Sequence, residues 1–230
     1  MSKKELTARY GFFIAGLYIM ASGIALTIKA GLGASSISCW PYVLSLKFPV
    51  SLGTFVFGLN VILIIGQMVV LKHDFKKIQY LQIPVSFLFS AFIDLSMLLF
   101  VSVVPESYPA RCIVLLAGCL LTGLGISMEV TANVVMLSAE AFIQAVVIKS
   151  GKEFGYLKIC FDVSCTLLAA VSSFLLLGGI SGVREGTVAA AIFVGLFARF
   201  FLHMTPRLRK IHIYRRSSQI HRTVYGQRLY

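Results

Sequence analysis

Three acidic residues stand inside strongly apolar stretches of this sequence: Asp94, Glu140 and Asp162. A carboxylate at the centre of a membrane-spanning helix costs roughly 2.5–3.5 kcal/mol, so each of these side chains needs a compensating role. One interpretation is that they coordinate a cation or a proton in the protein interior. The alternative is a buried carboxylate that hydrogen-bonds a neighbouring helix and serves packing alone. Glu129 lies near the end of its apolar stretch and is less surprising there.

A glycine- and serine-rich segment offers a different chemistry, because it suits an anion. Gly31 and Gly33 permit a tight backbone, and Ser35 or Ser36 is suited to cap a following helix. Such a helix start leaves N–H groups unpaired and presents the positive end of the helix dipole, which favours an anionic group. A plain surface turn with a good cap accounts for the same residues, and the sequence leaves both interpretations open.

Enzyme motifs are poorly represented. All four histidines lie in segments that flank the apolar runs, so no metal site combining them with the intramembrane carboxylates is expected. The sequence holds no H-E-x-x-H, G-x-S-x-G or phosphate-loop pattern. The five cysteines are odd in number and form no C-x-x-C, which indicates apolar packing residues. We therefore expect no enzyme activity, no catalytic residue, no bound metal and no cofactor.

The composition places the chain in a lipid bilayer. Hydrophobic residues make up 58% of the 230 residues and charged residues 13%, and the mean hydropathy is +0.88. Soluble domains carry about 25% charged residues. The net charge of +12 is concentrated in short flanks, above all in residues 205–230, which contain basic residues and no acid. Since Lys and Arg are retained on the cytoplasmic side, we expect both termini in the cytoplasm.

The basic tail, residues 205–230, has candidate partners of its own. Its cations suit anionic lipid headgroups, at roughly 1 kcal/mol for each cation close to the surface. Nucleic acid is not an expected partner, because no soluble domain is left to bind it. A topology signal with a mobile tail, or a specific lipid or protein site, both stay open.

Six apolar runs approach the roughly 20 residues that a helix needs to cross about 30 Å of hydrocarbon. Two further stretches, Ala30–Phe48 and Thr131–Ile148, are too polar and too broken for lipid-exposed spans. Irregular backbone at membrane depth survives only inside protein or along a cavity, so we predict two half-helices that dip in and return. The six predicted spans are Tyr10–Ile28, Gly53–Leu71, Gln79–Val104, Arg111–Val130, Gly155–Leu177 and Thr187–Leu202.

The two halves of the chain are related by an offset of 102 residues. Over 53 gap-free positions this offset gives ten identities and aligns the two broken stretches with each other. It also aligns Asn60 with Asp162, which adds Asn60 to the candidate site. We predict one membrane domain over residues 1–204, with repeat one at about 9–104 and repeat two at about 111–204, followed by the tail at 205–230.

The number of crossings decides how the repeats are related. Three crossings in each half invert the second half, and inverted repeats with broken helices are typical of transporters. Six spans place 17 basic residues inside and 4 outside, and eight spans place 16 inside and 5 outside. The charge distribution therefore barely separates the two. The basic cluster Lys72–Lys77 favours six, since eight spans would put it outside.

Several stretches also carry a resemblance to a known family. They are Gly23–Leu26 with Ala30–Gly33, Ser51–Phe55, Gln82–Val85 with Phe92–Leu95, and Gly151–Gly155 with Phe161, Asp162 and Val183–Thr187. On these the chain resembles the YczE/YitT-like family, most closely its YczE-like branch. The resemblance implies a bacterial cytoplasmic-membrane protein and no particular substrate. Proline is common in that family just before the helix of the broken stretch; here Ser36 and Ser138 stand instead, which leaves the helix start less sharply fixed.

The leading hypothesis is therefore an all-α, polytopic transporter for a small solute or ion, with about six transmembrane helices and two re-entrant half-helices. Its site would lie near the midplane between the repeats. Asp162, Asn60, Asp94 and Glu140 would supply oxygen ligands, and Gly31, Gly33, Ser35 and Ser36 would frame N–H donors. A non-transporting membrane subunit or sensor is the alternative, a membrane enzyme is disfavoured, and homo-oligomerisation stays open.

Overall fold

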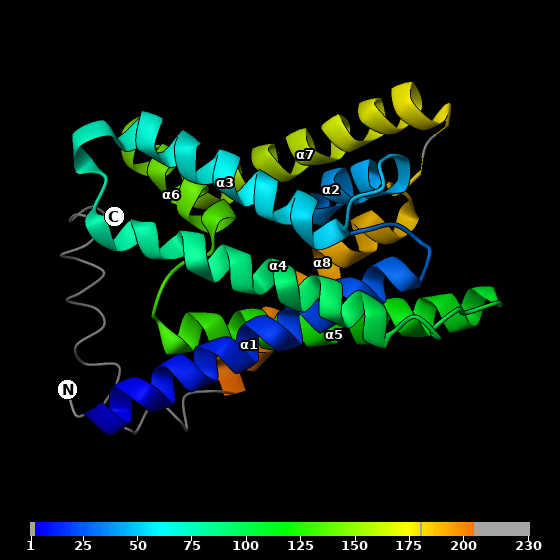
Figure 1. Cartoon of the computed structure of the whole chain (residues 1–230), viewed down its shortest axis with the longest axis horizontal. Helices are drawn as coiled ribbons and strands as arrows, with labels where there is room; N and C mark the ends of the chain where they lie inside the picture. Colours follow the sequence, from blue (N-terminus) through cyan, green and yellow to red (C-terminus); the bar gives the residue numbers. More distant parts are fainter. Residues whose placement is uncertain (1–2, 180, 205–230) are drawn as a thin grey trace.

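The computed structural model describes residues 3–179 and 181–204, and every regular element in them is helical (Figure 1). This confirms the all-α prediction. The predicted basic tail, 205–230, lies outside the described residues, and its separation from a membrane domain stays a prediction. The helices are α1 (Lys3–Lys29), α2 (Ser36–Lys47), α3 (Leu52–Leu71), α4 (Gln82–Leu99), α5 (Tyr108–Ala132), α6 (Ser138–Ser150), α7 (Phe154–Leu177) and α8 (Glu185–Met204), with short 3-10 helices η1 (Lys72–Asp74) and η2 (Lys77–Leu81).

Six of the helical segments are long and apolar enough to cross a membrane, as the sequence predicts. The first begins earlier than predicted, at Lys3 and not at Tyr10, and the third ends earlier, since α4 ends at Leu99 and not at Val104. Residues 100–107 form turns and non-helical backbone that lead into α5. Pro105 contributes, because a proline disfavours helical backbone in the residue before it.

The two broken stretches each contain a non-helical segment followed by a short helix. The first segment, residues 30–35, includes Gly31 at φ +69° and Gly33 at φ +117°, and the second, 133–137, begins with Asn133 at φ +47°. α2 and α6 have 12 and 13 residues, so at 1.5 Å per residue they measure about 18 and 20 Å. That is well short of the roughly 30 Å hydrocarbon core.

The short helices lie toward opposite ends of the bundle (Figure 1). α6 lies toward the end at which α1 begins, here called the amino-terminal end, and α2 lies toward the end at which α1 finishes, here called the opposite end. Each short helix packs against a long one from the other half of the chain: α2 against α7, and α6 against α3.

The longest interface of the described chain is the antiparallel crossing of α1 and α5, and four glycines make it close. Gly16 lies against Gly125, and Gly23 against Gly118. A Cβ built on Gly23 would stand 2.5 Å from the backbone nitrogen of Thr122, nearer than any real contact allows. Small residues of this kind let membrane helices approach to backbone contact.

The remaining long helices flank this central pair. α4 packs on α1, and α8 packs on α5. α3 also packs along α4, whereas α7 contacts α2 and α6 and forms no comparable interface with α8. α7 is consequently the most peripheral of the long helices, and most of its large apolar side chains face outward.

The crossing of α1 and α5 predicts a sharp difference between two glycine-to-alanine changes. Gly23→Ala forces the helices apart and should lower the stability of the purified protein by roughly 1–3 kcal/mol. Gly58→Ala is the matched control, because a Cβ on Gly58 of α3 meets nothing within 4 Å and alanine is the better helix former. Thermal unfolding in mild detergent measures both, and equal midpoints for the two variants would contradict the close crossing.

Candidate functional site

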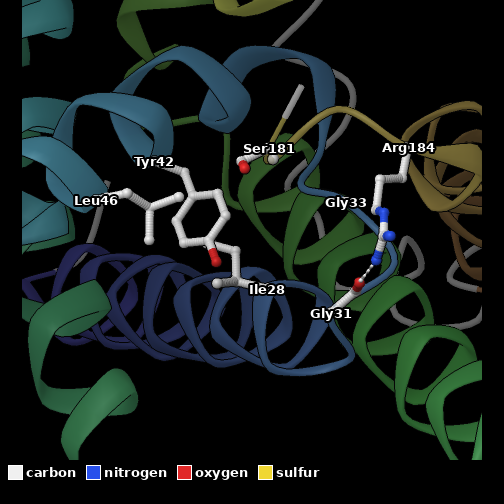
Figure 2. Close-up of a pocket in the computed structure, with 8 residues that line it drawn as sticks. Ile28, Gly31, Gly33, Tyr42, Leu46, Ser181 and Arg184 are labelled. Atoms are coloured by element: carbon white, nitrogen blue, oxygen red, sulfur yellow. Dashed lines mark hydrogen bonds between the residues drawn. The ribbon is translucent and has the colours of Figure 1, made fainter. Parts of the chain in front are cut away.

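A pocket of about 310 Å³ opens beside the first non-helical segment, at the opposite end of the bundle (Figure 2). Its residues come from the end of α1, the segment after it, α2, and the segment before α8. Two of the predicted anion-binding residues, Gly31 and Gly33, are among them. The pocket is lined by Ile28, Gly31, Gly33, Tyr42, Leu46, Ser181, Gly182 and Arg184.

Backbone hydrogen bonds hold two distant segments together at this pocket. The Ala34 amide donates to the carbonyl oxygen of Gly182 at 3.0 Å, and the Gly186 amide donates to the carbonyl oxygen of Leu32 at 2.8 Å. The segment before α8 therefore forms a fixed wall opposite α2.

Gly33, which faces this wall from the segment after α1, must be a glycine. Gly33 has φ +117°, and a Cβ there would stand 2.5 Å from the Thr187 hydroxyl and 3.0 Å from the backbone nitrogen of Arg184. Gly31 also has a positive φ, but a Cβ on it would meet open space. Gly33 thus allows α8 to pack closely, and Gly31 leaves room at the pocket.

Arg184 is the charged group of the pocket. Its Nη1 donates to the carbonyl oxygen of Gly31 at 3.2 Å, and within the described chain it forms no ion pair (Figure 2). A guanidinium group carries five N–H donors, and because Arg184 is exposed, the donors that Gly31 does not use are open to solvent and to a solute.

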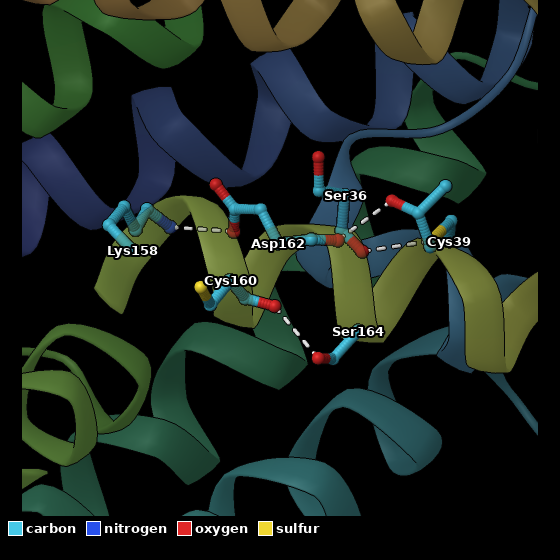
Figure 3. A network of polar contacts seen from close by, with 7 residues as sticks. Ser36, Cys39, Lys158, Cys160, Asp162 and Ser164 are labelled. Atoms are coloured by element: carbon cyan, nitrogen blue, oxygen red, sulfur yellow. Dashed lines mark hydrogen bonds and ion pairs between the residues drawn. The ribbon is translucent and has the colours of Figure 1, made fainter. Parts of the chain in front are cut away.

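The predicted serines lie next to the pocket but do not line it. Ser35 is the N-cap residue of α2, as the sequence suggests, yet its side chain makes no capping hydrogen bond. The carbonyl oxygen of Ser36 accepts a hydrogen bond from the Cys39 thiol at 2.8 Å (Figure 3). The helix start and the pocket are therefore neighbours and not one site.

A second polar cluster lies at the start of α6, between α3 and α4, and is closed to solvent. The amides of Gln67 and Gln82 exchange hydrogen bonds at 3.0 and 3.2 Å, although the two residues are only 0% and 1% exposed. Gln67 also donates to the carbonyl oxygen of Ser138 at 3.1 Å, and the Ser86 and Ser138 hydroxyls are 2.9 Å apart. We call Gln67, Gln82, Ser86 and Ser138 the glutamine cluster.

Two carboxylates stand at the same helix start. Glu129, in the last turn of α5, accepts a hydrogen bond from the Leu137 amide at 3.1 Å. Glu140, in the first turn of α6, interacts with it electrostatically and has a buried Oε2 without a hydrogen-bond partner. Of the predicted acids, Glu140 is thus the one whose carboxylate keeps an unsatisfied buried oxygen.

Asp162 lies on the outer helix α7 and is 26% exposed at its side chain. Its Oδ1 pairs with Lys158 Nζ at 2.9 Å, one turn earlier on the same helix (Figure 3). Cys160 and Ser164 on this helix are also exposed. The structure does not bring Asp162 to Asp94 or to Glu140, so a single set of carboxylate ligands is not formed.

Asp94 caps a helix. It lies five residues before the end of α4, and its two carboxylate oxygens accept hydrogen bonds from the Gly53 amide and the Ser51 hydroxyl, both at 2.7 Å. Those groups form the start of α3, so the carboxylate satisfies N-terminal donors of that helix. The packing interpretation therefore accounts for this acid.

Other buried polar groups also lack a partner among the described residues, Asn60 and Ser90 among them. Asn60 on α3 is 6% exposed and forms no hydrogen bond there, and the hydroxyl of Ser90 on α4 is fully buried without one. Native proteins satisfy the great majority of such groups, so unpaired ones invite a functional explanation.

Gln67, Ser86 and Arg184 were not among the site residues predicted from the sequence. One signal was available for α4. Gln82, Ser86, Ser90 and Asp94 recur every four residues, which places polar side chains along one face of a helix. Three of them are buried, so this face is directed into the protein.

The glutamine cluster predicts a non-additive response to mutation. Gln67→Met leaves the Gln82 amide and the Ser138 carbonyl without a buried partner and should cost roughly 1–3 kcal/mol of stability. Gln67→Met combined with Gln82→Met should cost less than the sum of the single changes, measured by unfolding in mild detergent. Gln144→Met is the control, since Gln144 on α6 makes no hydrogen bond with the described residues. Strict additivity would show that the pair is not coupled.

Comparison with known proteins bears out the resemblance seen in the sequence. Residues 7–203 match the model of a family of unknown function, DUF6198. The chain is similar to the uncharacterized membrane protein YczE of Bacillus subtilis (strain 168), with 28% identity over 221 residues, or 95% of this chain and 96% of that protein. No solved structure matches. The chain is thus a membrane protein that belongs to the family of unknown function DUF6198.

Proposed function

We propose that this protein is a transporter of a small solute or ion in the bacterial cytoplasmic membrane, built from two inverted repeats. It would work as a carrier and not as an enzyme. The observation that carries the proposal is that the two broken segments lie at opposite ends of the bundle and differ in accessibility. A pocket opens beside the first segment, whereas the glutamine cluster beside the second is closed to solvent.

The helix boundaries support two repeats. Adding 102 to the first residues of α2 and α3, Ser36 and Leu52, gives the first residues of α6 and α7, Ser138 and Phe154. The same offset relates Gly31 to Asn133, and both have a positive φ at the start of a broken segment.

The central crossing supports inversion. Adding 102 to Gly16 and Gly23 gives Gly118 and Gly125, so exchanging the halves turns the pair Gly16–Gly125 into the pair Gly118–Gly23. Both pairs are in contact. A two-fold axis that exchanges antiparallel helices is perpendicular to them. For helices that cross a membrane, such an axis lies in the membrane plane, as in inverted-repeat transporters.

The asymmetry of the two ends supports alternating access. Under the offset of 102, Arg184 of the open pocket corresponds to Gln82 of the closed glutamine cluster. Equivalent parts of the two repeats thus differ in state, which is what a carrier caught open to one side requires. The site would extend between these two places and not lie at the midplane alone.

The distribution of basic residues supports an outward-facing state. Lys72, Lys76 and the α6–α7 connection with Lys152 lie at the amino-terminal end, which we assign to the cytoplasm. The pocket then opens to the outside, and the glutamine cluster closes the cytoplasmic end.

Glu129 and Glu140 supply a group for coupling. Two carboxylates close together in an apolar setting repel each other, so the pair is stabilised by a bound proton or cation. Glu140 keeps its place in the proposed site, and Asn60, unpaired and buried on α3, remains a candidate oxygen ligand. A role for Asp162 as a ligand stays a prediction, since this residue lies on the peripheral helix α7.

Cysteine accessibility tests alternating access without knowledge of the substrate. In a cysteine-free background, Ser181→Cys should react from outside with a thiol reagent, because Ser181 lines the pocket. Ser138→Cys should react slowly from the cytoplasmic side, since opening of that end exposes a residue that is 0% exposed here. A variant that keeps only the buried Cys119 controls for general unfolding.

Reaction of Ser138→Cys no faster than that of Cys119 would contradict alternating access and favour the accessory-subunit alternative. Labelling of Ser138→Cys that slows when the outer pocket is cross-linked shut would contradict it as well. The proposal expects acceleration, because closure of one end accompanies opening of the other.

The assigned orientation has its own test. An impermeant maleimide should label Ser102→Cys on intact cells, because the connection between α4 and α5 is exposed at the outer end. Lys76→Cys, in the connection between α3 and α4, should be labelled only after the cells are permeabilised. Labelling of Lys76→Cys on intact cells would overturn the six-span orientation.

A further inference from the structure

We propose that the pocket at the opposite end binds a small organic anion, with its carboxylate on Arg184 and its apolar part against Ile28, Tyr42 and Leu46. The inference rests on the proposed function, because it names the class of solute that a carrier open to this side would take up. Its test measures binding alone, so that binding and transport can fail separately.

The charge of the lining decides the sign of the ligand. Among the described residues that line it, Arg184 is the charged one and none is a carboxylate. Glu185, the next residue, forms no ion pair with Arg184 within the described chain. A cationic solute would find no counter-charge among these residues, whereas an anion meets a guanidinium group that, within the described chain, hydrogen-bonds the Gly31 carbonyl alone.

The geometry of Arg184 suits a carboxylate. The bond to the Gly31 carbonyl restrains the side chain, and the backbone pairing of the segments around Leu32 and Gly182 fixes its base. Because a guanidinium group matches a carboxylate with two parallel hydrogen bonds, a restrained arginine with unused donors is suited to bind one.

The other side of the pocket suits an apolar group. In Figure 2 the ring of Tyr42 lies between Leu46 and Ser181, and Ile28 lies near the Tyr42 hydroxyl. The Tyr42 hydroxyl forms no hydrogen bond with the described residues and is available to a ligand, as is the Ser181 hydroxyl.

The volume of the pocket limits the ligand to a small molecule. At about 30 Å³ for each water in the liquid, 310 Å³ corresponds to roughly ten water molecules. That value is at the lower limit of the pockets that hold drug-sized ligands. A short-chain carboxylate fits it, whereas a complete phospholipid could place only its headgroup inside.

Fluorescence of the single tryptophan provides the measurement. Trp40 is on α2, two residues before Tyr42 of the pocket, and its indole N–H donates to Ser172 at 3.1 Å. Purified full-length protein in uncharged detergent is titrated with butyrate, and with butyramide and butylamine as neutral and cationic analogues. We expect a saturable change with butyrate and none with either analogue.

Variants assign the binding to the pocket. Arg184→Gln should weaken butyrate binding roughly tenfold or more, and Arg184→Lys should give an intermediate loss, since it keeps the charge without the paired donors. Arg111→Gln is the matched control: Arg111 also donates to a backbone carbonyl, that of Pro105 at 3.2 Å, but does not line the pocket. Unchanged thermal midpoints without ligand show that each variant is folded.

A lipid phosphate shares the chemistry of a carboxylate, so a parallel titration uses a short-chain phosphatidylglycerol. Binding of this lipid that depends on Arg184, without butyrate binding, would overturn the proposal and assign a headgroup site. Equal affinity for butyrate and butyramide, or full affinity in Arg184→Gln, would overturn it as well. Butyrate binding that depends on Arg184, in a protein whose Ser138→Cys never becomes accessible, would support the anion site and refute transport.

Discussion

The close antiparallel crossing of α1 and α5 is the contact on which the rest of the structure depends. Inside a bilayer no water drives helices together, so their association relies on tight packing. Gly16 with Gly125 and Gly23 with Gly118 leave no room for a side chain between the two backbones. α4 packs on one member of this pair and α8 on the other. In the proposed repeat, the same crossing would relate the two halves of the chain.

The pocket and the glutamine cluster both lie at the non-helical segments that follow α1 and α5. After α1 and after α5 the backbone breaks at a residue with positive φ, Gly31 or Asn133, and returns as a short helix. Non-helical backbone leaves donors and acceptors that the bilayer cannot satisfy, so each break must find partners in protein or border a cavity. The first break has both, in the segment before α8 and in the pocket. The second is packed against buried glutamines and carboxylates. The Glu129–Glu140 pair and Arg184 therefore each lie beside one of the two breaks.

The sequence predicted the helices well because membrane spans follow from length and hydropathy alone. Both broken stretches were also found, since glycines, serines and acids interrupt otherwise apolar runs. The site was predicted only in part. Gly31, Gly33 and Glu140 lie at the two breaks, but Asp94 caps α3 and Asp162 pairs with Lys158 on its own helix. A sequence gives the residue types in a span and not the neighbour that each side chain meets. That information came from packing between distant segments, as did the role of Gln67.

We propose that equivalent positions at the two ends exchange between open and closed states. Distances between pairs of spin labels test this exchange most directly. The outer pair is Leu46→Cys with Glu185→Cys. The inner pair, which the offset of 102 residues relates to it, is Ile148→Cys with Ile83→Cys, and all four sites are exposed. In lipid nanodiscs we predict two distances in each pair. The longer should dominate at the outer pair and the shorter at the inner pair, and a condition that shortens the first should lengthen the second. One unchanging distance in both pairs would contradict the account.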